Sequence, residues 1–211
     1  MKLLVFALVL LSMSFGGEPV WAQSEPLVLI GGGAGNSWAD SLTVFTVDDI
    51  DRMTDGDNTT GFTHTSLFGA DVPHYISGVQ ERFDFDVSRF ASISEIVFTW
   101  TGRHQWNSEV LNPFPSLRLG PDPPIPLLRI EFGSTTDATI RSGSLTLTGA
   151  NLTRSLRPGL ASIWVSTDFG SSTSTQWQFI SIETLEVTAT LTGEPIAVNS
   201  TSWGAIKNLY R

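Results

Sequence analysis

The sequence predicts an all-β protein, an antiparallel β-sandwich of jelly-roll type with about eight strands. Three observations predict this class. Apolar residues alternate with polar ones over many short stretches, which is the pattern of a strand with one buried face. Clusters of glycine, proline, asparagine and serine separate these stretches, as turns do. In addition, 41% of the residues are hydrophobic and only 16% are charged, which favours a folded chain.

The first 22 residues have the pattern of a secretory signal peptide. Lys2 precedes a continuous apolar run over Leu3–Leu11, and a small-residue cleavage site follows at Val20–Ala22. We therefore expect cleavage after Ala22 and a protein that is secreted or held in the periplasm or at the cell surface. No later apolar stretch approaches about 18 residues, so we expect no membrane-spanning segment.

The remaining chain is expected to form one domain with short extensions. Residues 23–41, including the run Gly31–Gly35, are interpreted as a flexible lead-in, and the sandwich is expected over residues 42–192. Asn112–Pro126 contains six prolines, which remove backbone donors and predict a loop or a sheet edge. The predicted strands, in chain order, cover Leu42–Val47, Phe83–Val87, Ile96–Thr101, Leu127–Phe132, Ser144–Thr148, Leu160–Thr167 and Leu185–Leu191.

A linker is expected over residues 193–202, followed by a short C-terminal tail over residues 203–211. Trp203, Ile206 and Tyr210 have helical spacing in this tail. Nine residues form a helix only marginally in water. We expect the tail to dock on a surface, either on its own sandwich or on an export or anchoring system.

Composition excludes several classes of function. The formal net charge of −9 makes nucleic acid and anionic lipid poor partners. The absence of cysteine excludes disulfides, thiolate metal sites and cysteine nucleophiles. The motifs G-x-S-x-G and H-E-x-x-H are also missing, which favours a protein without catalytic activity. A catalytic triad or carboxylate pair assembled from distant strands is nevertheless compatible with the sequence.

The densest acidic stretch, residues 48–61, predicts a calcium site. It contains five aspartates, and like charges this close are unfavourable unless they are solvated or neutralised by a cation. Ca²⁺ accepts about six to eight oxygen ligands of this kind. Gly56 permits a tight turn that directs Asp55 and Asp57 to one point. A solvated acidic loop is the alternative, because the spacing is not that of an EF-hand.

This stretch also carries a resemblance. Thr54–Thr60, with the sequence TDGDNTT, resembles the DGD-x-x-T turn of discoidin-type domains, the coagulation factor type C domains and related carbohydrate-binding jelly rolls. The segments Phe83–Val87 and Ile93–Trp100 resemble the strands that follow in that family. Gly61-Phe62 stands where the family often has a tryptophan, and residues 103–157 match no part of it.

The resemblance implies a jelly-roll fold and a structural Ca²⁺ ion bound through Asp55, Asp57 and Thr60. It also implies that a glutamate of the last strand completes the site. Glu183 is our first choice, because the alternation of apolar residues breaks there, and Glu186 is the second.

A candidate ligand site lies between the strand pattern near Thr101 and the proline-rich segment. Trp106 stands there among polar side chains, and an aromatic face beside hydrogen-bonding groups suits a sugar ring. A tryptophan that covers the open end of the sandwich is the alternative interpretation. Trp100 and Trp164, which lie inside strand patterns, are expected in the core. The predicted ligand-binding residues are Arg103, His104, Gln105, Trp106 and Asn107.

Together these features predict a secreted, non-catalytic binding module for extracellular glycan or another cell-surface component, with calcium as a structural ion. Two alternatives remain open at this point. One is a surface or matrix protein that uses the sandwich for self-association or adhesion, and the other is an extracellular hydrolase. The lack of cysteine favours a bacterial source.

Overall fold

The computed structural model describes residues 22–36, 42–68, 79–106, 116–121, 126–131, 139–167 and 178–196. The predicted signal peptide up to Trp21, Asn107 and the predicted tail lie outside these residues. The described elements are, in chain order, β1 (Gln23–Pro26), β2 (Leu29–Asn36), β3 (Thr43–Val44), α2 (Val47–Thr54), β4 (Phe62–Phe68), β5 (Val79–Asp86), β6 (Phe90–Trp106), β7 (Ser116–Gly120), β8 (Leu128–Glu131), β9 (Arg141–Leu147), α3 (Gly149–Ser155), β10 (Leu156–Arg157), β11 (Leu160–Thr167) and β12 (Gln178–Pro195).

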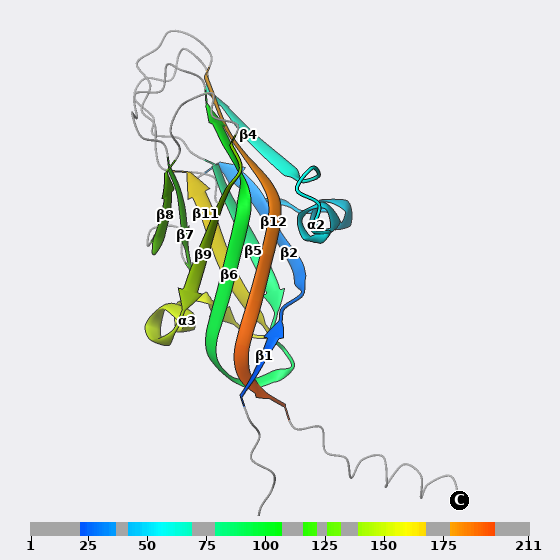
Figure 1. Ribbon diagram of the computed structural model, residues 1–211, viewed down its shortest axis with the longest axis vertical. Helices are drawn as coiled ribbons and strands as arrows, with labels where there is room; N and C mark the ends of the chain where they lie inside the picture. Colours follow the sequence, from blue (N-terminus) through cyan, green and yellow to red (C-terminus); the bar gives the residue numbers. More distant parts are fainter. Residues whose placement is uncertain are drawn as a thin grey trace, which may run out of the picture.

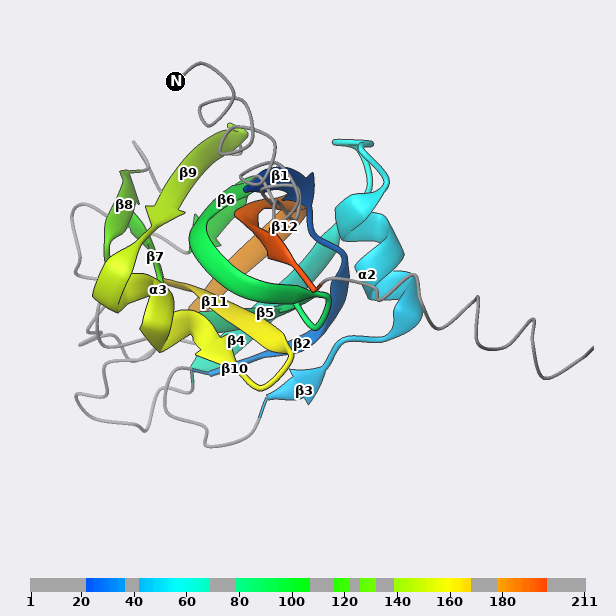
Figure 2. The same ribbon diagram turned by 90° about the horizontal axis from the view of Figure 1, so that it is seen from below.

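The predicted antiparallel β-sandwich is confirmed, with twelve described strands rather than about eight. One sheet has five strands in the order β1-β12-β6-β9, and β4 pairs with β12 on the same edge as β1. The other sheet has seven strands in the order β3-β2-β5-β11-β7-β8, with β10 paired to the start of β11. The two sheets lie face to face. In Figure 2, β6 and β12 are drawn in the upper part of the molecule, and β5 and β11 lie beneath them. Figure 1 shows α2 and α3 on opposite sides of the sandwich.

The core lies between the sheets, where β5 faces β6. Phe83 and Phe85 point inward from β5, and Phe98 and Trp100 point inward from β6; none of the four is more than 1% exposed. The ring centroid of Phe98 lies 5.9 Å from that of Phe83 and 6.1 Å from that of Phe85. Burial of such side chains stabilises the fold by about 1.5–3 kcal/mol each. The expectation that Trp100 belongs to the core is confirmed.

The alternation of β12 breaks at a bulge. Thr184 pairs with Gly102 and Glu186 with Thr101, so Leu185 is the extra residue. Thr184 and Leu185 are consecutive and are both fully buried. The residues on either side of this pair, Glu183 and Glu186, therefore lie on the outer face of the five-stranded sheet.

The expectation of a flexible lead-in over residues 23–41 is wrong for the described part of that range, because residues 23–26 and 29–36 form two strands. β1 pairs with the end of β12, with Gln23 opposite Gly193, and β2 pairs with β5 over residues 29–36. The glycines of β2 are therefore ladder residues and not a flexible spacer. Residues 193–195, which were predicted to belong to a linker, are instead the end of β12.

Two helices replace segments that the sequence did not mark as helical. Only Thr43–Val44 of the predicted strand Leu42–Val47 is extended, and α2 begins directly after the cap residue Thr46. The hydroxyl of Thr46 accepts the N–H of Asp49 at 3.2 Å, and the carboxylate of Asp49 accepts the N–H of Thr46 at 2.8 Å. This capping box is the local signal that starts the helix.

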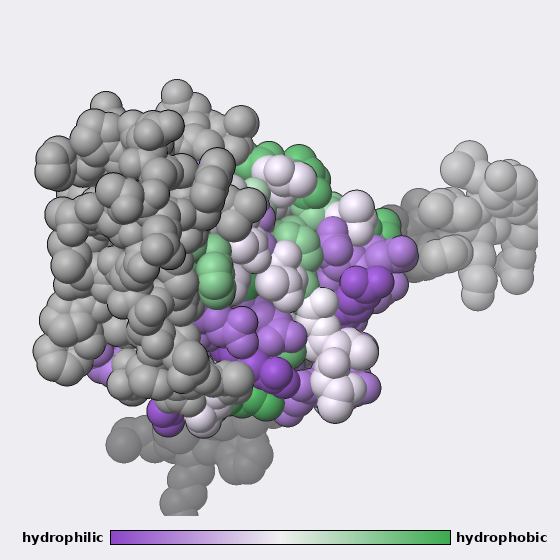
Figure 3. All heavy atoms as spheres, turned by 90° about the horizontal axis from the view of Figure 1, so that it is seen from above, coloured by the Kyte–Doolittle hydropathy of each residue, from purple (hydrophilic) through white to green (hydrophobic). Residues whose placement is uncertain are grey.

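None of the described helices is both long enough and apolar enough to cross a lipid bilayer. The described residues visible from above form a surface on which hydrophilic and hydrophobic patches lie side by side (Figure 3).

Candidate functional site

The outer face of the seven-stranded sheet carries a polar cluster across β5 and β11. Alternation sends Phe83 and Phe85 of β5 and Ile163 and Val165 of β11 into the core, so their neighbours point outward. The ladder places these neighbours in facing pairs, which we call the outer polar face: Gln80 with Ser166, Arg82 with Trp164, and Asp84 with Ser162.

Arg82 is held in one orientation by two partners. Its guanidinium carbon lies 5.7 Å from the ring centroid of Trp164, and its Nε and Nη2 atoms lie 3.1 and 3.0 Å from Oδ2 of Asp84. Oδ1 of Asp84 accepts a hydrogen bond of 2.6 Å from the hydroxyl of Ser162. Both oxygens of the Asp84 carboxylate are thus engaged, and the arrangement of ring, cation and carboxylate is fixed before any ligand arrives.

This arrangement offers the contacts that a sugar ring requires. Trp164 is half-buried and supplies aromatic surface for C–H groups, while Arg82, with a side chain 39% exposed, supplies donors for hydroxyl oxygens. Gly31 is paired with Asp84 from the adjacent strand β2, and a Cβ atom there would meet nothing within 4 Å. The missing side chain leaves open space beside the cluster.

The sequence interpretation missed this site because it assigned Trp164 to the core. The structure corrects that assignment: Ala161, Ile163 and Val165 are the apolar residues of β11 that are fully buried, whereas Trp164 is only partly buried and lies on the opposite face of the strand. The sequence pattern contained this information, because Trp164 alternates with these apolar residues and therefore points to the same face of the strand as Ser162. A tryptophan on the polar side of a strand pattern is a candidate for binding.

The structure separates the residues that were predicted to bind a ligand at the end of β6. The strand continues to Trp106, which pairs with Ile180, so the segment is not a loop. His104 is 1% exposed, and burial lowers its pKa to about 3, whereas Arg103 and Gln105 lie on the outer face. His104 therefore cannot share a binding surface with its two neighbours. The side chain of Trp106 and all of Asn107 lie outside the described part of the chain.

The predicted calcium loop brings its own oxygens together. The hydroxyl of Thr60 lies 2.7 Å from Oδ2 of Asp55 and 3.1 Å from the main-chain oxygen of Asp57. Oδ1 of Asp55 accepts the N–H of Asp57 at 2.7 Å. Oδ1 of Asp57 accepts the hydroxyl and the N–H of Thr59 at 2.7 and 2.9 Å, and these bonds lower the pKa of Asp57. The Asp55 carboxylate and the main-chain oxygen of Asp57 thus meet at the hydroxyl of Thr60, while the carboxylate of Asp57 bonds to Thr59.

The two candidate glutamates flank the place where this loop meets β12. A Cβ atom on Gly61 would lie 2.6 Å from the carbonyl oxygen of Thr184, so the end of the loop touches the bulge. Glu183 forms an ion pair with Arg103, with Oε2 3.5 Å from Nε. Glu186 lies opposite Thr101 on the outer face. Within the described ranges, no three His, Asp or Glu side chains are grouped as metal ligands.

A buried carboxyl group lies inside the sandwich, apart from either site. Glu81 of β5 is 0% exposed, and its Oε2 accepts a hydrogen bond from the hydroxyl of Thr184. That hydroxyl accepts the indole N–H of Trp100 at 2.8 Å. Burial raises the pKa of Glu81 to about 8, although the bond from Thr184 opposes the shift. Glu81 is therefore protonated at neutral pH and links the two sheets as a neutral group.

Comparison with known proteins gives fold-level neighbours only. Neither a protein-family model nor a curated protein sequence matches the chain. The chain is similar to a solved structure described as that of CBM4, a carbohydrate-binding module, at 11% identity and a TM-score of 0.27. This match covers 58% of the present chain and 92% of the other.

A second neighbour is a mutant of chitosan-binding module 1 from a chitosanase/glucanase of Paenibacillus sp. IK-5. It matches at 12% identity and a TM-score of 0.25, over 80% of the present chain and 99% of the other. Both neighbours are carbohydrate-binding modules, and neither is described as a discoidin-type domain. At TM-scores of this size the likeness carries no argument, so the proposals that follow depend on the residues described above.

Proposed function

We propose that the protein is a secreted, non-catalytic module that binds extracellular glycan on the outer polar face. The observation that carries this proposal is the fixed cluster of Trp164, Arg82, Asp84 and Ser162. It joins an aromatic surface to a donor fork that Asp84 holds in place, which is the chemistry that recognises the C–H face and the hydroxyl oxygens of a sugar.

The charge of the cluster favours a hydroxyl-rich ligand over a phosphate-rich one. Arg82 is neutralised by Asp84 at 3.0 Å, and the whole chain carries a formal charge of −9. A polyanion such as nucleic acid would meet net repulsion and a cation that is already paired. A glycan needs only directional hydrogen bonds and a ring to stack on, and the outer polar face supplies both.

Replacing Trp164 with alanine should weaken glycan binding at least tenfold, because an aromatic anchor contributes about 1.4 kcal/mol or more. Arg82→Lys should also weaken binding, because lysine keeps the charge and loses the planar donor fork. A glycan array first identifies a ligand for the wild-type protein, and isothermal titration calorimetry then compares the variants. Melting temperatures should stay close to that of the wild type, since both side chains are partly exposed.

Arg89 provides the matched control. It also stacks on an aromatic ring, 5.3 Å from the centroid of Phe90, and pairs with a carboxylate, Glu25, at 3.0 Å. Arg89→Ala removes a similar pair elsewhere on the molecule and should leave affinity unchanged. If Trp106→Ala abolishes binding and Trp164→Ala does not, the ligand lies at the end of β6 and the outer polar face is not the site.

We further propose that the loop of residues 55–60 holds a structural calcium ion. The meeting of the Asp55 carboxylate and the Asp57 main-chain oxygen at Thr60 supports this, together with the contact between Gly61 and β12 beside Glu183 and Glu186. When bound, the ion would neutralise the loop carboxylates and brace the start of β4 against β12. Glycan binding on the outer polar face does not require it.

Removing calcium with EDTA should lower the melting temperature, because an ion bound only to the folded state adds about 2.7 kcal/mol at a hundredfold excess over Kd. Differential scanning calorimetry with and without Ca²⁺ measures the change. Asp57→Ala should remove the response, whereas Asp51→Ala, on the neighbouring helix α2, should retain it. Comparing Glu183→Gln with Glu186→Gln identifies which glutamate contributes. Identical melting curves in EDTA and in Ca²⁺ would leave the loop as a solvated turn.

A further inference from the structure

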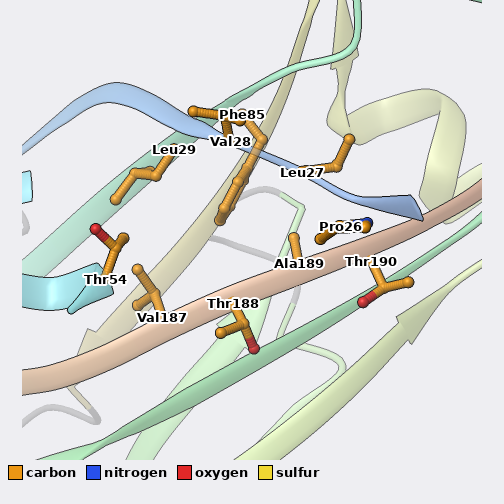
Figure 4. A pocket seen from close by; sticks show the side chains of 10 residues that line it. All are labelled: Pro26, Leu27, Val28, Leu29, Thr54, Phe85, Val187, Thr188, Ala189 and Thr190. Atoms are coloured by element: carbon orange, nitrogen blue, oxygen red, sulfur yellow. The ribbon is translucent and has the colours of Figure 1, made fainter. Parts of the chain in front are cut away.

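One edge of β12 is paired by two strands that do not meet. β4 pairs with residues 178–184 and β1 pairs with residues 190–193, so no described strand covers residues 185–188 on that edge. A cavity of about 470 Å³ opens there, between the β1–β2 connection, the end of α2 and β12 (Figure 4). We call it the edge groove. Its apolar lining consists of Pro26, Leu27, Val28, Leu29, Phe85, Val187 and Ala189.

The edge groove has the size and chemistry of a binding site. Its volume falls within the range of about 300–1,000 Å³ that is usual for ligand pockets, and its walls are mainly aliphatic. Val28 is 63% exposed at its rim and offers accessible apolar surface there. Thr54, the last residue of α2, also lines the groove. Leu27, Leu29, Phe85, Val187 and Ala189 are at most 9% exposed, so Pro26 and Val28 give an apolar occupant its main accessible contacts.

We propose that the occupant is the C-terminal segment of the same chain, residues 203–211. The described chain ends at Ile196, six residues beyond Thr190 of the groove lining, which is about 20 Å along a strand. The seven residues from 197 to 203 span at most about 25 Å. Trp203 is therefore the first large apolar side chain after Ile196 that can return to the groove, and Ile206, Leu209 and Tyr210 follow it.

Charge favours the same occupant. Residues 203–211 contain Lys207 and Arg211 and no acidic residue. Helix α2, whose end lines the groove, exposes Asp48 and Asp51. None of the residues that line the groove is charged, so the positive charge of the tail would act on these two neighbouring carboxylates of α2, in a chain that is strongly acidic overall. Docking also removes from water the apolar side chains that a free tail would leave exposed.

A pair of introduced cysteines tests the proposal in the full chain. The protein contains no cysteine, so a disulfide can form only between the two new residues. Val28→Cys at the groove rim is combined with Ser202→Cys, which leaves Trp203 in place. The control combines Ser202→Cys with Val44→Cys, because Val44 is also exposed, at 73%, and lies on β3 outside the groove lining.

Under mild oxidation at low protein concentration, the groove pair should form an intramolecular disulfide at least fivefold faster than the control pair. Mass spectrometry and thiol counting measure the rate. Trp203→Ala in the groove pair should slow the reaction severalfold. Equal rates for the two pairs would overturn the proposal. So would disulfide-linked dimers as the main product, since they would show that the tail enters the groove of a second copy.

Discussion

Between pH 4.5 and pH 7, the unfolding free energy of the wild-type protein is expected to fall by about 3 kcal/mol because of Glu81. The variant Glu81→Gln should not show this fall. The folded protein keeps Glu81 protonated, because burial raises its pKa from 4.5 to about 8. The unfolded chain ionises the same residue near pH 4.5. As the pH rises above that value, the unfolded state gains stability from ionisation that the folded state does not share.

The direction of this effect follows from proton binding. Between pH 4.5 and pH 8 the folded state binds one more proton at Glu81 than the unfolded state does, so stability falls with rising pH. The full contribution is present below pH 4.5 and is lost as the pH approaches 8. The slope is about 1.4 kcal/mol for each pH unit, before other groups are added.

Denaturant unfolding of wild type and variant from pH 4 to pH 9 measures this difference. The amide of glutamine does not titrate, so the stability of Glu81→Gln relative to wild type should rise with pH, whatever constant offset its unpaired N–H groups impose. Glu81→Leu should give the same slope with a different offset. Glu194→Gln, an exposed position of β12, serves as the control. Parallel stability profiles for wild type and Glu81→Gln would contradict the assignment of a buried neutral carboxyl.

Glu81 also illustrates how far the strand pattern alone can lead. The alternation of Phe83 and Phe85 places position 81 on the inner face when it is extended by two residues. The pattern alone offers no partner for a carboxyl group there. The partners, Thr184 and Trp100, come from the other sheet, and Thr184 turns inward next to Leu185 because of the bulge in β12. Local periodicity is sufficient to place position 81 on the inner face, while the hydrogen bonds of Glu81 depend on contacts between distant segments.

For the candidate glycan site, too, the sequence predicted the kind of residue, while the position of the site depends on tertiary contacts. The sequence predicted a tryptophan with polar neighbours, and it placed them in consecutive positions around Trp106. The structure instead joins Arg82 and Asp84 to Trp164 and Ser162 through the register of β5 and β11. Consecutive residues of a strand point to opposite faces, so a binding surface on a sheet is built from alternate residues of neighbouring strands. That register is a property of the tertiary fold.

The second large effect on stability is expected from a substitution of Gly32 in β2. Gly32→Ala is expected to lower the unfolding free energy by at least about 3 kcal/mol, and the melting temperature by about 6–12 °C for a chain of this length. Gly32 has φ +133°, a conformation that residues with a Cβ atom rarely adopt. An added Cβ would also lie 1.9 Å from the carbonyl oxygen of Arg82, which is main chain and cannot rotate away. Thermal unfolding followed by circular dichroism measures the change.

The adjacent residue supplies the control. A Cβ atom on Gly31 would meet nothing within 4 Å, so Gly31→Ala should stay within about 1 kcal/mol of the wild type. A flexible lead-in would tolerate both substitutions equally, so equal melting temperatures would support the interpretation of residues 23–41 as a flexible lead-in.

Gly32 contacts the main chain of Arg82 on β5. Gly32→Ala should consequently reduce glycan affinity even below its melting temperature, because the displaced strand carries the guanidinium away from Trp164.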